Sequence, residues 1–158
     1  MAPAEPDIGA PPRQTTESVL MATSRALRRA YDQRLAGAGL KISEAYLLAH
    51  VHNLGPLTQT QLAEGLGLGR AATGALVDAL ERKGLVERSA HAADRRVWLV
   101  ATTERAVPVV DEVTAVDVAV RQQVWTGISQ SERRQLSQIL QRLQGNLAAI
   151  LNDAEPTG

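Results

Sequence analysis

The sequence predicts a mostly α-helical protein with one small β-hairpin. Of the 158 residues, two are Trp, two are Tyr and none is Phe, so Leu, Val and Ala must fill the core, which suits helices packed on helices. Apolar residues recur every three or four positions along most of the chain, as in amphipathic helices. Residues 85–88 and 96–100 break this period, because they favour β-structure and flank a polar tip at residues 89–95.

Composition argues against several classes of function. With no Cys, the chain has no disulfide, thiolate metal site or cysteine nucleophile. His residues at positions 50, 52 and 91 cannot make a closed metal site without carboxylates, so we expect no metal and no cofactor. No Ser-His-Asp, paired-carboxylate or phosphate-loop spacing occurs, which argues against an enzyme. Seventeen basic and seventeen acidic residues give a net charge of +0, so nucleic-acid binding would require a local concentration of Arg.

The two ends of the chain are expected to be tails. Residues 1–15 are rich in Pro and Ala and lack a basic leader and an apolar stretch, so we interpret them as a disordered tail rather than a signal peptide. Residues 153–158 form a shorter tail. No apolar run of about 18 residues occurs, so we expect no membrane span and a cytoplasmic location.

Two helices are expected in the first third of the chain. Residues 16–38 carry apolar residues at helical spacing, and Gly37 and Gly39 end this helix. A second helix begins with Ser43 as its N-cap and ends at the stop signal Leu54-Gly55-Pro56.

The centre of the chain has the pattern of a helix-turn-helix. Thr58 and Gln61 match a T-x-x-Q capping box, and Gly67 closes the short helix that follows. A second helix runs over residues 70–83, with Gly84 as its left-handed stop. Its inward face is expected to comprise Ala72, Leu76, Ala79 and Leu80. Two short helices joined by a Gly-containing turn form a helix-turn-helix, and the hairpin after them is expected to be its wing.

Two long helices are expected to complete the chain. Thr103 is interpreted as the N-cap of the first, which is rich in Val and runs to about Thr126, and Ser129 and Glu132 match a second capping box. The apolar stripe of the last helix comprises Leu136, Ile139, Leu140, Leu143, Leu147, Ile150 and Leu151. Such a stripe favours a symmetric dimer, because a small central domain has too little core to cover it.

These elements predict a winged helix-turn-helix with N- and C-terminal dimerisation helices. We place the N-terminal helix of the dimerisation region at residues 16–40, the winged helix-turn-helix at residues 41–102 and the C-terminal dimerisation helices at residues 103–152.

Positive charge gathers at two places that suit DNA binding. Arg70 begins the second helix of the motif, whose N-terminal end reaches base edges in the major groove, and Thr73 follows one turn later on the same side. The wing concentrates Arg residues around Arg96, which Asp94 can hold extended as a minor-groove probe. The expected DNA-binding residues are Thr58, Gln59, Gln61, Arg70, Ala71, Thr73, Arg88, His91, Asp94, Arg95 and Arg96.

From about Thr16 to Leu151 the sequence resembles the MarR family of bacterial regulators. The residues that carry the resemblance are Gly55-Pro56-Leu57-Thr58, Gln61-Leu62-Ala63, Leu66-Gly67-Leu68, Leu76-Val77-Asp78, Leu80-Glu81, Lys83-Gly84-Leu85-Val86-Glu87-Arg88 and Asp94-Arg95-Arg96. The resemblance implies a homodimer on pseudo-palindromic double-stranded DNA, a minor-groove role for Asp94 and Arg96, and an effector pocket between the dimerisation helices and the DNA-binding part. Small residues at positions 71, 72, 74 and 75 depart from the usual family pattern, so we expect few direct base contacts and a larger share of specificity from Arg70, Thr73, the wing and DNA shape.

Residues for a small organic effector are harder to identify. Tyr46 and His50 lie four positions apart and share a helix face, and His50 interrupts an apolar run. Two interpretations stay open for His50: a hydrogen-bonded, partly buried side chain, or part of an effector pocket. The expected effector-binding residues are Arg25, Tyr31, Tyr46, His50 and Trp125. Trp98 is expected to pack on the wing sheet instead.

The sequence therefore predicts a sequence-specific DNA-binding transcription regulator, a repressor that a small-molecule effector releases. The alternative is a winged-helix protein-interaction module with weak or no DNA binding, which the near-zero net charge and the Ala-rich recognition helix favour.

Overall fold

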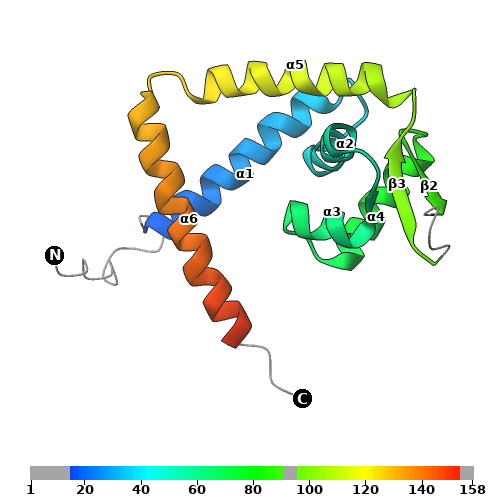
Figure 1. Cartoon of the computed structure of the whole chain (residues 1–158). Helices are drawn as coiled ribbons and strands as arrows, with labels where there is room; N and C mark the ends of the chain where they lie inside the picture. The colour runs from blue at the N-terminus through cyan, green and yellow to red at the C-terminus, as the bar shows by residue number, and fades with distance from the viewer. Residues whose placement is uncertain (1–14, 91–95, 154–158) are drawn as a thin grey trace. The chain divides into compact units, whose positions relative to one another are not determined.

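The computed structural model describes residues 15–90 and 96–153. They form six helices and a small three-stranded antiparallel sheet (Figure 1). The elements are α1 (Thr16–Leu35), α2 (Ile42–Leu54), β1 (Leu57–Thr58), α3 (Gln59–Leu66), α4 (Arg70–Arg82), β2 (Val86–Ala90), β3 (Trp98–Thr102), α5 (Ala106–Val124) and α6 (Gln130–Asp153). The chain divides into two compact units, one ending at Val120 and one beginning at Arg121.

Helix α2 lies at the centre of the first unit and packs against α1, α3, α4 and β3. Its residues Leu47 and Leu48 are fully buried, together with Leu62 of α3, Leu80 of α4 and Val100 of β3. Burying these aliphatic side chains is the main term that stabilises the unit, at about 25 cal/mol per Å² of apolar surface removed from water.

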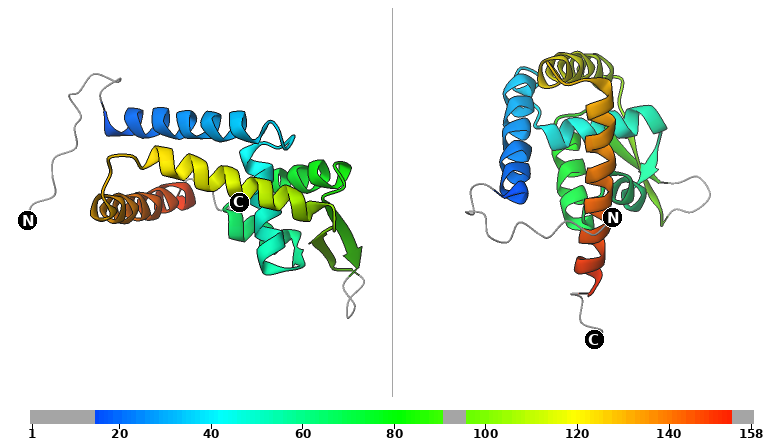
Figure 2. Two further views of the ribbon diagram at one scale, coloured as in Figure 1. Left: turned by 90° about the horizontal axis from the view of Figure 1, so that it is seen from above. Right: turned by 90° about the vertical axis from the view of Figure 1, so that its left-hand side faces the viewer.

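Only the last part of α1 joins this core. Tyr31 and Leu35 are buried, whereas residues 16–17 and 19–29 are exposed along the single chain and Ser18 is half-buried. The Tyr31 hydroxyl donates a hydrogen bond of 2.8 Å to Asp117 of α5, and the two helices run alongside each other in Figure 2. The first four turns of α1 therefore lack the packing that normally stabilises a helix in a globular protein.

The start of α2 differs from the sequence expectation. Lys41, and not Ser43, is the N-cap, and Ser43 lies inside the helix. The Lys41 N–H donates to Glu44 at 2.8 Å, and the Ile42 N–H donates to Asp32 of α1 at 2.8 Å. Two carboxylates thus satisfy the first N–H groups of a helix that begins before Ser43.

The helix-turn-helix forms as predicted. Thr58 caps α3 in a reciprocal capping box with Gln61, Gly67 ends α3 with a φ of 63°, and Gly84 follows α4 with a φ of 71°. The predicted inward face of α4 is partly wrong. Thr73, Val77 and Leu80 are its buried residues, Leu76 and Ala79 are half-buried, and Ala72 is exposed. Successive residues turn by about 100° along a helix, so the true face is centred one position away from the expected one.

The wing strands begin one or two residues later than predicted and end two residues later. Strand β3 lies between β1 and β2 and pairs with both, so that Val86 lies opposite Thr102 and Leu57 opposite Val100. The short strand β1 was not expected. The interpretation of Thr103 as a helix N-cap was wrong: its hydroxyl donates to the Gly84 carbonyl at 2.7 Å and its N–H to the Leu85 carbonyl at 3.1 Å. These hydrogen bonds join the end of β3 to the residues just before β2, and α5 begins three residues after Thr103.

Helix α5 packs several of its Val residues within the first unit. Val110, Val113 and Val120 are buried, and Val109 and Val116 pack against the same core. Pro108 is the third residue of the helix, where the missing N–H has no partner within the helix to lose.

The second unit contains the end of α5 and all of α6. The predicted capping box is present, because the Ser129 N–H donates to Glu132 at 2.8 Å and the Glu132 N–H donates to the Ser129 hydroxyl at 3.3 Å. The hydrogen bonds from Ser129 lower the pKa of Glu132. The Arg133 guanidinium lies over the Trp125 ring at 5.3 Å and donates to the Trp125 carbonyl at 3.1 Å. Apart from half-buried Leu140, the apolar stripe of α6 is exposed in the single chain, up to 67% at Leu151.

None of the helices in the described ranges has the length and apolar character that crossing a membrane requires.

Candidate DNA-binding site

Helix α4 presents a strongly polar side chain at its first residue. Arg70 is exposed, and Ala71 and Ala75 are exposed after it. Gly69 is the N-cap and provides no side chain to accept hydrogen bonds from the first N–H groups of α4. An exposed guanidinium beside these donors suits an anionic ligand such as a phosphate.

Gln59 holds the start of α4 in place. Its side-chain Nε2 donates to the Arg70 carbonyl at 3.3 Å. The amide lies close over Gly74, where an added Cβ would come within 2.9 Å of Nε2. Thr58 and Gln61 are engaged in the capping box of α3. The structure thus gives these three expected DNA-binding residues local structural contacts, and their contact with DNA stays a prediction.

Thr73 does not have the position expected of it. Its side chain is fully buried, and its hydroxyl donates to the Gly69 carbonyl at 3.1 Å. Thr73 is therefore not exposed beside Arg70 as expected, because its side chain packs into the core, and its contact with DNA stays a prediction that this burial disfavours.

The described part of the wing carries two of its expected Arg residues. Arg96 is exposed just before β3. Arg88 lies on β2, and its guanidinium forms ion pairs with Asp78 and Glu81 of α4. Burial lowers the pKa of Arg88, but the hydrogen bond to Asp78 and the charges of both carboxylates outweigh it, so that the pKa is raised. The expected residues His91, Asp94 and Arg95 lie outside the described residues.

A pocket of about 290 Å³ opens between α1, α2 and the end of α3 in the first unit. It is lined by Ser24, Leu27, Arg28, Ile42, Ser43, Tyr46, Leu66 and Leu68. Of the five expected effector residues, Tyr46 alone belongs to this lining. Arg28 was missed, although its place on the exposed face of α1 one turn after Ser24 puts it on the same side of the helix.

The other expected effector residues have different surroundings. Arg25 is exposed on α1, and Tyr31 is buried 6.4 Å from the Tyr46 ring between centroids. His50 is half-buried and packs so closely on α3 that a Cβ at Gly65 would lie 2.5 Å from its Nε2. This position fits the interpretation of a partly buried packing side chain. Trp125 lies in the second unit under Arg133.

Trp98 also differs from its expectation, because 56% of it is exposed at the start of β3.

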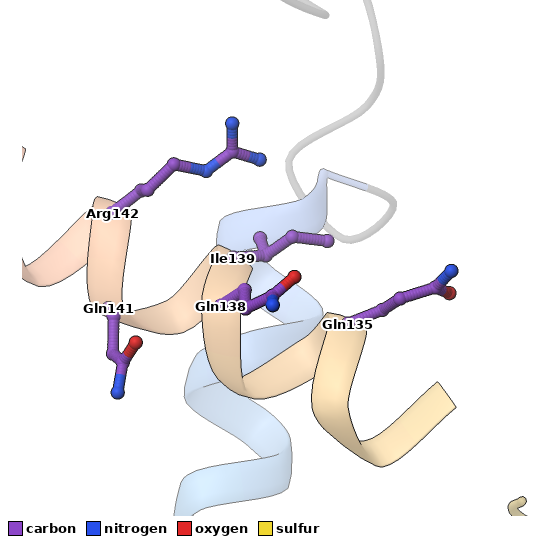
Figure 3. A pocket seen from close by; sticks show the side chains of 5 residues that line it. All are labelled: Gln135, Gln138, Ile139, Gln141 and Arg142. Carbon is purple, nitrogen blue, oxygen red and sulfur yellow. The ribbon is translucent and has the colours of Figure 1, made fainter. Parts of the chain in front are cut away.

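A wider hollow of about 680 Å³ borders α6. Figure 3 shows its lining residues, Gln135, Gln138, Ile139, Gln141 and Arg142, all on this one helix. A surface formed by a single helix cannot enclose a small ligand, so we assign no ligand site to it.

Several proteins of known structure share this architecture. Residues 38–97 match the model of the MarR family. The transcriptional regulator PA3341 is 35% identical, over 84% of this chain and 98% of that chain, with a TM-score of 0.73. MepR from S. aureus in its DNA complex is 22% identical, over 84% of this chain and 98% of that one, with a TM-score of 0.77. CouR from Rhodococcus jostii RHA1 bound to p-coumaroyl-CoA is 24% identical, over 82% and 91%, with a TM-score of 0.72. The last two similarities show a shared fold.

Proposed function

The chain belongs to the MarR family of winged-helix transcription regulators, and on that premise we propose that it is a homodimeric repressor that binds pseudo-palindromic double-stranded DNA and is released by a small organic effector. The observation that carries this proposal is the exposed Arg70 at the first residue of α4, in a helix-turn-helix that the strands β2 and β3 follow directly. Helices of this kind place their N-terminal residues against base edges in the major groove, with the wing beside the adjacent groove.

Two unpartnered apolar surfaces support a homodimer. On α1 the exposed apolar residues are Val19, Leu20, Met21 and Leu27, and on α6 they are Leu136, Ile139, Leu143, Leu147, Ile150 and Leu151. Apolar surfaces of this extent on two long helices are uncommon in a monomer. If a second copy covers them across a two-fold axis, the two α4 helices would have to lie about 34 Å apart to enter successive major grooves. Replacing Leu147 by Glu should produce a monomer in light scattering and weaken DNA binding; an unchanged dimer mass would contradict this interface.

The pocket beside Tyr46 supports a small organic effector. Its volume of about 290 Å³ fits one small molecule, and its lining combines apolar side chains with the Arg28 guanidinium and the Tyr46 ring. This chemistry suits a compact aromatic anion, since a guanidinium pairs with a carboxylate while the ring and the aliphatic side chains cover the apolar part. Binding at the junction of α1 and α2 would release DNA only if the ligand prefers a spacing of the two α4 helices of the dimer that does not fit DNA.

The decisive experiment measures DNA affinity on a duplex selected from a random library, with fluorescence anisotropy over a salt series. We expect affinity to fall steeply with salt, as phosphate contacts require. Arg70→Ala and Arg96→Ala should each weaken binding by about 10- to 100-fold. Arg134→Ala, which removes an exposed Arg from α6, serves as the charge-matched control and should bind as the wild type does.

A second candidate function is a protein-interaction module. The observation that favours it is the row of small exposed residues Ala71, Ala72 and Ala75 on α4, which offers little for base reading. The same experiment separates the two functions. Selection that enriches no sequence, together with an affinity that does not respond to salt or to Arg70→Ala, would exclude the regulator and support the module.

A further inference from the structure

The ion pairs of Arg88 connect the wing, which consists of β2 and β3, to helix α4. Arg88 lies in the middle of β2, opposite Val100 of β3, and its two terminal nitrogens contact different carboxylates of α4. Asp78 and Glu81 are three positions apart, so they are neighbours on the helix surface. The Arg88 side chain is 25% exposed, against 52% for Asp78 and 39% for Glu81. The guanidinium is therefore the least exposed member of the cluster.

This cluster stands beside the surface that we propose to face DNA. Asp78 follows Ala71 and Ala75 at the i, i+4, i+7 spacing of one helix face, and all three are exposed. A bare carboxylate on that face would repel the phosphates of an approaching duplex. The two carboxylates carry a formal charge of −2, and Arg88 reduces the charge of the cluster to −1.

The geometry also argues against a phosphate contact by Arg88. Both ends of its planar fork already bind carboxylates, and a phosphate would have to displace one of them. The sequence expectation counted Arg88 among the DNA contacts because its partners on α4 are not visible in the wing sequence.

We propose that Arg88 is a positioning residue: it fastens β2 to α4 and offsets the carboxylates of Asp78 and Glu81, and it does not bind DNA itself. This inference rests on the proposed DNA-binding function. It assigns the contact with the duplex to Arg70 at the start of α4 and to Arg96 of the wing. The effect of Arg88 on DNA binding then depends entirely on Asp78 and Glu81.

A double-mutant cycle on the full-length protein tests the proposal. Arg88→Ala should weaken binding to the selected duplex by about tenfold in the wild-type background. In the background of Asp78→Asn with Glu81→Gln, where Arg88 has no carboxylate to act through, the same change should alter affinity by no more than about twofold. The salt dependence of binding should keep its slope on Arg88→Ala, because a lost phosphate contact would reduce that slope by about one. An equal loss in both backgrounds, or the reduced slope, would overturn the proposal.

Two further measurements keep the result interpretable. Circular dichroism checks that each variant folds, and Arg88→Lys, which keeps the charge but not the fork, should have an intermediate affinity. Hydrogen exchange of the β2 amides without DNA should rise in Arg88→Ala and in the Asp78→Asn, Glu81→Gln variant, and should rise no further when all three changes are combined. If the wild type binds no DNA but this exchange pattern holds, the proposed function fails while the link between wing and helix stands; if the exchange pattern is absent, the link itself fails.

Discussion

Replacing Lys83 with Met should destabilise the first unit, because it leaves a nearly buried carboxylate without its cation. Lys83 is the C-cap of α4, and its Nζ lies 2.8 Å from both oxygens of Glu44 and 2.7 Å from the Gly39 carbonyl. The Glu44 side chain is 10% exposed and that of Lys83 is 37% exposed. After the replacement, Glu44 keeps the hydrogen bond from the Lys41 N–H at 2.8 Å.

The magnitude follows from these exposures. Removing one partner of a fully buried ion pair costs about 3–5 kcal/mol, whereas exposed pairs contribute about 0–1 kcal/mol. Because Lys83 is more than one-third exposed and Glu44 keeps one donor, we expect about 2 kcal/mol. For a chain of this length that loss lowers the Tm by about 4–8 °C. Glu44→Gln should cost less, about 1 kcal/mol, because the partly exposed Lys83 ammonium can be hydrated while it keeps its hydrogen bond to the Gly39 carbonyl.

Urea unfolding followed by circular dichroism at a fixed protein concentration measures these changes. The double variant Glu44→Gln, Lys83→Met should lie within about 1 kcal/mol of the wild type, because no buried charge is left. Arg82→Met, one residue earlier and exposed, is the control and should change stability by less than about 0.5 kcal/mol. A Lys83→Met variant as stable as that control would refute the reasoning.

Three other predictions concern single side chains. Thr73→Val should leave affinity for the selected duplex within about twofold in the anisotropy assay, because the side chain is buried; a larger loss would restore Thr73 as a DNA contact. Gly84→Ala should cost about 1–2 kcal/mol in urea unfolding, because position 84 has a φ of 71° and the new methyl would meet the Arg105 side chain at 3.0 Å; an unchanged midpoint would contradict this conformation. Glu132→Gln should alter the pH dependence of stability. Hydrogen bonds from Ser129 lower the pKa of Glu132, so they stabilise the fold above the ordinary value of 4.5, and the contribution is lost as pH falls through the lower folded-state value. The urea midpoint of the variant should therefore fall less steeply below pH 4.5 than that of the wild type, and identical pH profiles would exclude this contribution.

Local signals in the sequence predicted most of the helix ends correctly. The capping boxes at Thr58 and Ser129 form between residues three positions apart, and the left-handed conformations of Gly67 and Gly84 depend on their own backbone. Such features need no knowledge of the rest of the fold, so their residue types and spacing were sufficient to predict them.

Several errors have the opposite property, because they depend on a partner outside the local segment. Asp32 supplies a carboxylate to the first turn of α2, which made Ser43 unnecessary as a cap. Pairing with β2 keeps Thr102 in the strand. At the site, the wing sequence alone predicts that Arg88 is a solvent-exposed cation, because it does not show the two ion-pair partners on α4. The pocket beside Tyr46 likewise combines three helices, and no single segment shows it.

Thr58 belongs both to the sheet and to the start of α3, which limits how β3 and α3 can move relative to each other. It is paired with Leu99 in the sheet, and it is also the N-cap of α3. A rotation of β3 about α3 would therefore have to break a strand pairing and a helix cap together. Helix α2 packs against both α3 and β3, so the strand and these two helices are expected to move as one rigid body. A hinge that repositions this body is then expected at its borders, in the turn before α2 and in the turn between Thr103 and α5.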